Sequence, residues 1–322
     1  MSQQTPSEKA LTQALKSIAR DARVKERIRR SPEGYALFMR AAKKYVTGER
    51  REDGIEAGVR LASKGYKVSL EYIGENTSVE AECEAAAGEF SALIRDCGRL
   101  GLSARISLDL SHIGLAVSPA LARDHLSDLA REAQSFGLEL VVSMEESEKT
   151  NAILDVYKQV SPHFSNVGIT LQAQLNRTPA DVKEVLGCPG TIRIVKGAYQ
   201  EPPGICLPRS DALNERYLAL LDTCMAAGQA VSVATQDEAL IERVLENSAL
   251  QKAKAEFEML YGIRPDLAGR LRSEGHPVRL YLTYGTEWYL YLCHRIAEHP
   301  PNLYDAVVDM INGAPDRTDD YR

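Results

Sequence analysis

The stretch TIRIVKG, residues 191–197, combines the composition of a buried strand with two cations. Ile192, Ile194 and Val195 give it the apolar, β-branched character typical of a strand, and Gly197 ends it. Alternation along a strand places Arg193 on one face and Lys196 on the other. Because a buried charge needs a partner, this stretch predicts either ion pairs with neighbouring strands or a bound anion.

Seven further runs share this strand-like character. They are residues 67–75, 104–111, 139–146, 167–174, 230–237, 255–262 and 278–285. The gaps between them hold helical patterns, several of which end in a glycine that suits a helix C-cap. Eight strand–helix units of about 30 residues each favour an α/β fold, the (β/α)8 TIM-type barrel. An open doubly wound sheet is the alternative, and it is weakened because no GxGxxG follows the first run.

The regions outside the repeating units have simpler patterns. Residues 7–62 repeat apolar positions at helical spacing, and Ser31 followed by Pro32 suits the start of a helix. We therefore expect an N-terminal helical segment at residues 1–64, a barrel at residues 65–312 and a flexible tail at residues 313–322.

Bulk properties exclude several classes of protein. The formal net charge of −6 argues against nucleic acid as the partner. No apolar run approaches the roughly 18 residues that a membrane-spanning helix needs. The six cysteines form no CxxC pair, which argues against a zinc site, and the polar N-terminus is unlike a signal peptide. Free thiols in the cytoplasm are the expectation.

Polar residues collect at the C-terminal ends of the predicted strands, where a barrel of this type holds its active site. They include Asp109, Ser143, Gln172, Lys196, Thr235, Gln236, Asp237 and Tyr281. Any single charge there can be an ion pair that holds two strands together. The set as a whole favours a bound anion such as a phosphate-bearing cofactor, because several unpaired charges at one edge are costly.

The helix TEWYLYLCHRIAEH, residues 286–299, carries charges on adjacent turns. His294 and Glu298 are four residues apart, and Arg295 and Glu298 are three apart, so each pair lies close on the helix surface. Taken alone, this pattern favours an ordinary amphipathic helix with a surface ion pair.

Four stretches together resemble the proline dehydrogenase family, and the resemblance spans roughly residues 35–310. The stretches are IRIVKGAY (192–199), GITLQAQLNRTPADV (168–182), EMLYGIRPDL (258–267) and VRLYLTYGTEWYLYLCHRIAE (278–298). This resemblance implies a distorted (β/α)8 barrel that binds FAD and passes a hydride from the substrate to flavin N5.

Carried over residue by residue, the family pattern implies a cofactor site and a catalytic set. The implied FAD-binding residues are Gln172, Arg193, Val195, Lys196, Gly197, Ala198, Thr235, Gln236 and Asp237, with Gln236 standing where the family usually has His. The implied catalytic residues are Tyr281, Arg295 and Glu298. A cation close to flavin N1 would stabilise the reduced cofactor, and this gives Arg193 and Lys196 a role.

The sequence departs from the family pattern where the substrate carboxylate would be held. Asp109 stands in place of the Lys of a KLS motif, Ser143 in place of the Asp of a DxE motif, and His294 in place of the first Arg of YxxRRxAE. Asp109 would repel a carboxylate, so we expect a substrate other than free L-proline. The implied substrate-binding residues are Asp109, Ser143, Leu260, His294 and Arg295.

We therefore expect a flavin-dependent dehydrogenase or oxidase acting on a proline-like or other amine, with a quinone or oxygen as electron acceptor. Three alternatives stay open. One is a genuine L-proline dehydrogenase that yields 1-pyrroline-5-carboxylate and relies on Arg295 alone. Another is a non-catalytic barrel with a binding role. The third is an aldolase-like barrel in which Lys196 forms a Schiff base.

Overall fold

Eight parallel strands close into a barrel in the computed structural model, which describes residues 6–19, 21–247, 254–298, 301–313 and 316–322. The strands are β1 (Lys67–Tyr72), β2 (Ala104–Leu108), β3 (Glu139–Val142), β4 (Val167–Gln172), β5 (Ile192–Val195), β6 (Val231–Ala234), β7 (Ala255–Leu260) and β8 (Val278–Tyr284). Each strand pairs with the next in chain order, and β8 pairs with β1 to close the ring. The predicted TIM-type barrel is confirmed, and each predicted run contains one strand.

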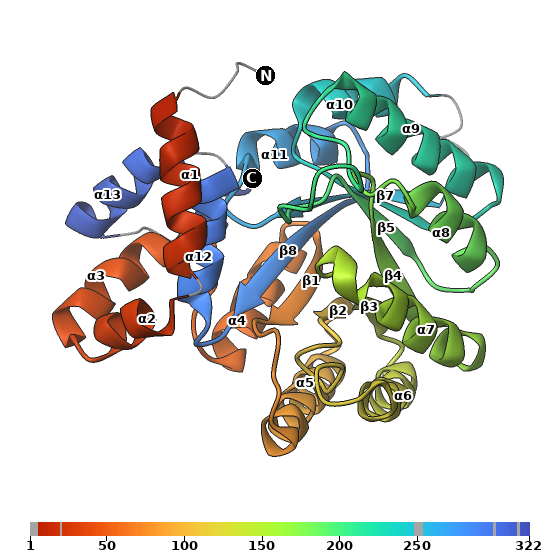
Figure 1. Ribbon diagram of the computed structural model, residues 1–322, viewed down its shortest axis with the longest axis horizontal. Helices are drawn as coiled ribbons and strands as arrows, with labels where there is room; N and C mark the ends of the chain where they lie inside the picture. The colour runs from red at the N-terminus through yellow and green to blue at the C-terminus, as the bar shows by residue number, and fades with distance from the viewer. Residues whose placement is uncertain (1–5, 20, 248–253, 299–300, 314–315) are drawn as a thin grey trace.

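Helices follow the strands and surround the barrel (Figure 1). They are α5 (Glu80–Leu100), α6 (Pro119–Ser135), α7 (Thr150–Val160), α8 (Thr178–Val185), α9 (Asp211–Ala226), α10 (Glu238–Leu245), α11 (Pro265–Ser273) and α12 (Trp288–Glu298). The chain starts with α1 (Pro6–Ala19), α2 (Ala22–Arg29), α3 (Pro32–Ala42) and α4 (Arg51–Ser63), and α13 (Asn302–Asn312) follows α12. Single turns of 3-10 helix are Ser147–Lys149, Ser161–His163 and Arg317–Asp320.

Local signals fix several helix ends where the sequence predicts them. The Ser31 side chain accepts a hydrogen bond from the Gly34 N–H at the start of α3, and Pro32 occupies the first turn. Gly101 ends α5 in the left-handed conformation, with φ 66°. These caps set the length of the helices and therefore the place where each strand begins.

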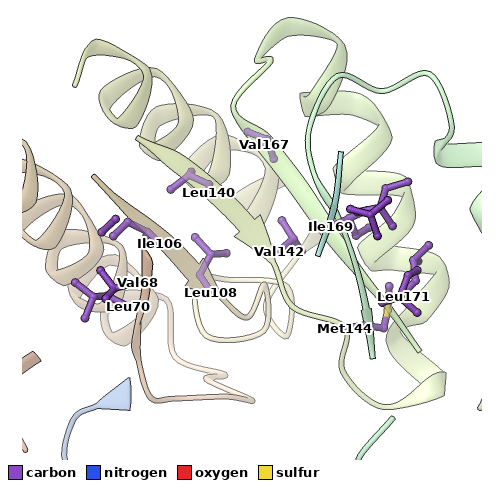
Figure 2. Close-up of a cluster of buried hydrophobic side chains, with 14 of the residues drawn as sticks. Val68, Leu70, Ile106, Leu108, Leu140, Val142, Met144, Val167, Ile169 and Leu171 are labelled. Atoms are coloured by element: carbon purple, nitrogen blue, oxygen red, sulfur yellow. The ribbon is translucent and has the colours of Figure 1, made fainter. Parts of the chain in front are cut away.

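The main apolar core lies between the outer face of the sheet and the surrounding helices. Val68, Leu70, Ile106 and Leu108 are at most 1% exposed and belong to this core. Figure 2 shows these side chains with their counterparts from β3 and β4, such as Leu140 and Ile169. Since alternate residues of a strand face opposite ways, the remaining strand positions face the inside of the barrel.

A second apolar cluster joins the first helices of the chain to its end. Trp288, Leu292 and Ile296 of α12 are buried against residues of α1 and α3, and Figure 1 shows these helices together beside β8. The Trp288 Nε1 donates to the Tyr35 hydroxyl over 3.0 Å. The N-terminal helices therefore hold α12, which carries several predicted site residues, in place. The domain boundaries at residues 64 and 312 stay predictions.

Residues 316–322 pack against the barrel wall. The Tyr321 ring is fully buried, stacks on Tyr261 at a centroid distance of 5.9 Å and meets the edge of Tyr66. Its hydroxyl accepts a hydrogen bond from the Gly262 N–H at 2.8 Å. The sequence predicts a flexible tail here, and the described part differs because Tyr321 fills an aromatic slot that hydrophilic neighbours conceal in the sequence.

All six cysteines lie in the described part of the chain and form no disulfide. Among the described residues, no helix combines the length and the hydrophobicity that crossing a lipid bilayer requires.

Candidate active site

We call the part of the barrel interior below the C-terminal ends of the strands the lower interior. An ion-pair network fills it, in place of the branched apolar side chains usual for this fold. Arg193 on β5 makes a forked contact with Glu258 on β7, through Nε at 3.0 Å and Nη2 at 2.9 Å. Arg105 on β2 reaches Glu258 at 3.1 Å and Glu256 at 2.8 Å, and Arg279 on β8 reaches Glu256 at 2.7 Å. Every one of these five side chains is nearly or fully buried.

The network sets the protonation of its carboxylates. Burial by itself would raise the pKa of Glu258, but Arg193, Arg105 and Arg279 outweigh it and hold the pKa far below its ordinary value. The same balance lowers the pKa of Glu256. Both groups are therefore anionic, and together with three arginines they form a network of ion pairs that ties four strands together.

Arg193 of β5 and Lys196, which follows this strand, thus both contact protein carboxylates. Besides Glu258, Arg193 donates to the hydroxyls of Ser107 (2.7 Å) and Thr170 (3.3 Å), so most of its N–H groups are used inside the barrel. Lys196 lies higher, where β5 ends, and its Nζ is 2.6 Å from Asp237 Oδ2. The ion-pair alternative is confirmed for both residues, and a contact of either with a cofactor stays a prediction.

The predicted cofactor residues lie together where β4, β5 and β6 end. Gly197 has φ 109°, and a side chain there would lie 2.4 Å from the Gln174 side chain, so only glycine fits. Ala198 is exposed, and Val195, the last residue of β5, is half-buried. Thr235 is buried, whereas Gln236 and Asp237 are partly exposed at the start of α10.

Gln172 is held by the protein. Its Nε2 donates to the Glu145 carbonyl at 2.7 Å, and its Oε1 accepts from Gln174 Nε2 at 3.3 Å. The Gln174 amide also donates to the Tyr199 carbonyl at 3.1 Å, which fixes the loop after β5. Gln172 therefore helps to position this loop through its hydrogen bonds.

Carboxylates gather at the barrel mouth, which we define by Glu71, Glu75, Asp109 and Glu145. Burial, together with the carboxylates of Glu145, Glu71 and Glu75, raises the pKa of Asp109 well above its ordinary value, although a hydrogen bond from Ser143 opposes the rise. Glu145 is fully buried, accepts from the Ser111 N–H at 2.9 Å and pairs with Lys149 at 2.7 Å. The mouth therefore carries more negative than positive charge around Asp109.

Two tyrosines line this mouth. The Tyr281 hydroxyl on β8 donates to Glu71 Oε2 on β1 at 2.6 Å, and the Arg193 guanidinium lies 4.9 Å from the centre of the Tyr281 ring. Burial, with Asp109 and Glu75 beside it, raises the pKa of Tyr199 well above its ordinary value. The structure therefore brings the predicted residues Asp109, Ser143 and Tyr281 into one mouth.

The remaining predicted residues lie at its edge. Leu260 ends β7 and is half-buried, and His294 and Arg295 are half-buried on α12. Arg295 stacks on the Tyr291 ring at 4.9 Å, and its charge opposes the rise that burial causes in the pKa of Glu71. Glu298 is the last residue of α12, and its side chain lies outside the described residues.

Sequence reasoning missed Glu71, Glu75 and Glu258. Glu71 and Glu258 interrupt apolar strands at positions where alternation places them inside the barrel, next to Ser69 and Glu256 respectively. A carboxylate at an inward strand position was the available signal. Their partners could not be read from the sequence, because they come from strands far away along the chain.

Comparisons with solved structures support this fold. Proline utilization A from Bdellovibrio bacteriovorus, in a crystal structure inactivated by N-propargylglycine, matches 84% of this chain with a TM-score of 0.72 and 17% identity. A Bradyrhizobium japonicum proline utilization A mutant matches 99% of this chain with a TM-score of 0.66 and 17% identity. The match covers 35% of the first protein and 46% of the second, so this chain corresponds to less than half of each.

Sequence comparisons identify the family. Proline dehydrogenase 1 of Bacillus subtilis subsp. natto is 31% identical over 81% of this chain and 87% of its own length. Proline dehydrogenase of Deinococcus radiodurans is 32% identical over 84% of this chain and 90% of its own. The family model for proline dehydrogenase matches residues 55–302. The chain therefore belongs to the proline dehydrogenase family, whose members are flavin-dependent oxidoreductases acting on CH–NH donors.

Proposed function

We propose that this protein is an FAD-dependent oxidoreductase that oxidises the C–N bond of a proline-like cyclic amine whose carboxylate is absent or masked, as in an amide or a thioester. The observation that carries the proposal is the acidic mouth. Asp109 stands where the resemblance implies a Lys for the substrate carboxylate, and Glu71 and Glu145 lie close enough to raise its pKa. A free carboxylate placed there would meet like charge, which costs several kcal/mol in a desolvated site.

The residues at the ends of β5 and β6 fit the proposed cofactor. Lys196 supplies a cation, Thr235 a hydroxyl and Ala198 an exposed backbone, and Gly197 lets the chain pass without a side chain. Bound FAD would supply the hydride acceptor. Arg193 contributes a fixed positive charge from the lower interior, because its forked contact with Glu258 holds the guanidinium against the Tyr281 ring.

The mouth is suited to a cationic substrate. Cyclic secondary amines carry a proton at neutral pH, and an ammonium is attracted by the carboxylates of Glu71 and Asp109. The Tyr281 ring offers an apolar face and Leu260 a second apolar contact for the ring of the substrate. Orientation of the amine between these groups is the contribution of the protein.

Oxidation of free L-proline is the second candidate, and the names of the relatives favour it. Arg295 supports it as well, because its charge reaches the mouth, where it opposes the rise in the pKa of Glu71. In that case Arg295 would hold the carboxylate alone. For both candidates we propose a quinone or oxygen as the electron acceptor.

The test is the visible spectrum of the purified protein, followed by anaerobic addition of L-proline, L-prolinamide or pyrrolidine. We expect a flavin band that L-prolinamide or pyrrolidine bleaches at least about tenfold faster than L-proline does, the factor that about 1.4 kcal/mol of discrimination gives. Faster bleaching by L-proline would establish the second candidate.

Asp109→Lys is the matched variant, because it restores the cation that the family pattern implies. It should shift the preference towards L-proline by a factor of about ten or more. A protein that binds no added FAD would contradict the proposal, and borohydride trapping of an adduct on Lys196 would then support the aldolase-like alternative.

A further inference from the structure

A tyrosine and a glutamate face the barrel mouth as a hydrogen-bonded pair. Tyr281 is on β8 and Glu71 on the neighbouring strand β1, and the register places Glu71 opposite Thr283, two residues beyond Tyr281. The Tyr281 hydroxyl donates to Glu71 Oε2 at 2.6 Å. The ion-pair network that binds Glu258 does not include Glu71, which lies one inward position above Ser69, the residue whose hydroxyl donates to Glu258.

We propose that Glu71 accepts, through the Tyr281 hydroxyl, the proton that the substrate ammonium must lose before its C–N bond can be oxidised. The inference rests on the proposed amine oxidation. It assigns a role to a half-buried carboxylate that lies among the site residues and whose main described partner is the Tyr281 hydroxyl.

The proton transfer balances without an added reactant. The N–H bond of the ammonium breaks, and the Tyr281 oxygen takes this proton while its own proton passes to Glu71 Oε2. The substrate becomes a neutral amine with a lone pair, and Glu71 becomes a neutral carboxylic acid. Tyr281 ends as it began, and no atom is oxidised or reduced.

The surroundings of Glu71 suit this exchange. Burial raises its pKa to about 7, whereas Tyr281 and the cations Arg193 and Arg295 oppose the rise. The titratable and charged groups that face it come from β8 (Tyr281), β5 (Arg193), α12 (Arg295), β2 (Asp109) and the loop after β1 (Glu75). With a pKa of about 7, Glu71 is partly ionised near neutral pH and can take up a proton there.

Asp109 is less suited to the same role. The Tyr281 hydroxyl donates its hydrogen bond to Glu71, so a proton relayed through Tyr281 reaches Glu71. Asp109 is hydrogen-bonded to Ser143, just after β3, although its charge is near enough to help raise the pKa of Tyr281. The two carboxyl groups therefore have different roles: Asp109 adds to the negative charge of the mouth, and Glu71 exchanges a proton.

A second tyrosine–glutamate pair offers a matched control. The Tyr284 hydroxyl, also on β8, donates to Glu89 Oε1 on α5 at 2.9 Å, and Arg51 pairs with Glu89 at 2.6 Å. Tyr284 belongs to the core between sheet and helices. Glu89→Gln therefore changes the same chemical contact outside the barrel, where no substrate can reach it.

The first test measures the rate of flavin bleaching by L-prolinamide, mixed anaerobically at saturating concentration from pH 6 to pH 9. In the unmodified protein the rate should rise with pH through about 7, because Glu71 must be ionised to accept the proton. Glu71→Gln should bind FAD normally, lose this rise and bleach about 10²- to 10⁴-fold more slowly. Tyr281→Phe should lose the rise too, and Glu89→Gln should keep it.

The second test does not depend on turnover. With any flavin reduced beforehand, L-prolinamide is added at pH 8 and the infrared difference spectrum is recorded. We expect a new carbonyl band of a protonated carboxylic acid in the unmodified protein and in Glu89→Gln, and no band in Glu71→Gln. Such a band would support Glu71 even if no amine bleached the flavin, a result that would contradict only the proposed function.

The opposite pattern overturns the inference. A rise through pH 7 that persists in Glu71→Gln, or an infrared band that this substitution leaves unchanged, would assign the proton to another group. A rate loss in Glu71→Gln that is equal at every pH would show that Glu71 only positions Tyr281.

Discussion

The lower interior of the barrel and its mouth hold the same kind of side chain, a carboxylate, with its pKa shifted in opposite directions. Below, Glu256 and Glu258 meet three arginines, and the pKa of each carboxyl is lowered. At the mouth, Glu71 and Asp109 lie beside further carboxylates, and the pKa of each is raised. Burial acts in the same direction in both places, so the partners decide the sign.

This contrast separates stability from function. A network of paired buried charges holds strands in register. Because its hydrogen bonds are already made, it leaves few donors or acceptors for a ligand. A mouth with surplus carboxylates costs stability, and such a cost is typical of a site that waits for a cation or exchanges protons. Arg193 lies between the two regions. Its guanidinium forms a forked contact with Glu258 and lies over the Tyr281 ring.

The largest effect is expected from Glu258→Gln, which breaks the matched side of the comparison. It leaves Arg193 buried without its carboxylate and removes one of the carboxylates that Arg105 contacts, so we expect the free energy of unfolding at pH 7 to fall by about 3–5 kcal/mol. The stability that Glu258 contributes is fully present above pH 4.5, its ordinary pKa, and is lost as the pH falls through its lowered folded value. Urea denaturation from pH 7 down to pH 3 should show the gap closing.

Glu215→Gln is the matched control for this experiment. It removes the same charge from a forked ion pair with Arg243, at 2.7 Å and 3.0 Å, on the exposed surface. Almost no change is expected, because solvent screens such a pair. Equal losses in the two variants would mean that the interior network contributes no more than a surface ion pair.

An effect of opposite sign is expected from Asp109→Asn. The folded protein raises the pKa of Asp109, so its ionised form costs stability as the pH rises above the ordinary value of 3.8. Removing the charge should therefore stabilise the protein at pH 8, because the ionised form no longer has to be accommodated beside the other carboxylates. The gain should vanish below about pH 4, where the carboxyl is protonated in both states.

Thermal unfolding of Asp109→Asn and of the unmodified protein at pH 4 and pH 8 measures this difference. Ser143→Ala is the companion variant, because it removes the hydrogen bond that opposes the raised pKa of Asp109. It should lower stability at pH 8 and not at pH 4. Destabilisation by Asp109→Asn at pH 8 would mean that a cation compensates Asp109, and the mouth would then resemble the lower interior.

The sequence predicted the barrel well because its signals are local. Each of the eight runs contains a strand, and caps such as Ser31 and Gly101 lie where expected. The runs extend beyond the strands at their C-terminal ends, because residues such as Ser143 and Lys196 leave the sheet to form the mouth. Strand propensity continues there, whereas hydrogen bonding to the neighbouring strand does not.

The site was predicted only in part, because pairing inside a barrel joins residues far apart in sequence. Arg193 was noticed as a buried cation, but its partner Glu258 is 65 residues away. Glu71 and Tyr281 are 210 residues apart and meet only because β8 closes against β1. Residue type and alternation along each strand identified the residues that face inward. Which of them are in contact depends on the closure of the barrel.

The smallest of the three effects is expected from Lys149→Met at the edge of the mouth. Lys149 pairs with Glu145 at 2.7 Å and Glu146 at 2.8 Å, and it is partly exposed. Glu145 keeps its bond from the Ser111 N–H, so we expect a loss of only about 1 kcal/mol at pH 8.

Lys158→Met, in an exposed pair with Glu184 on the neighbouring helix, is its control and should change stability hardly at all. Because Glu145 is the first charged neighbour that raises the pKa of Asp109, removing Lys149 also makes the mouth more acidic. Lys149→Met should therefore enlarge the gain in stability that Asp109→Asn brings, which a double-mutant cycle at pH 8 measures. Strict additivity of the two substitutions would show that Lys149 and Asp109 do not interact electrostatically. Glu145 would then not belong to the residues that define the mouth.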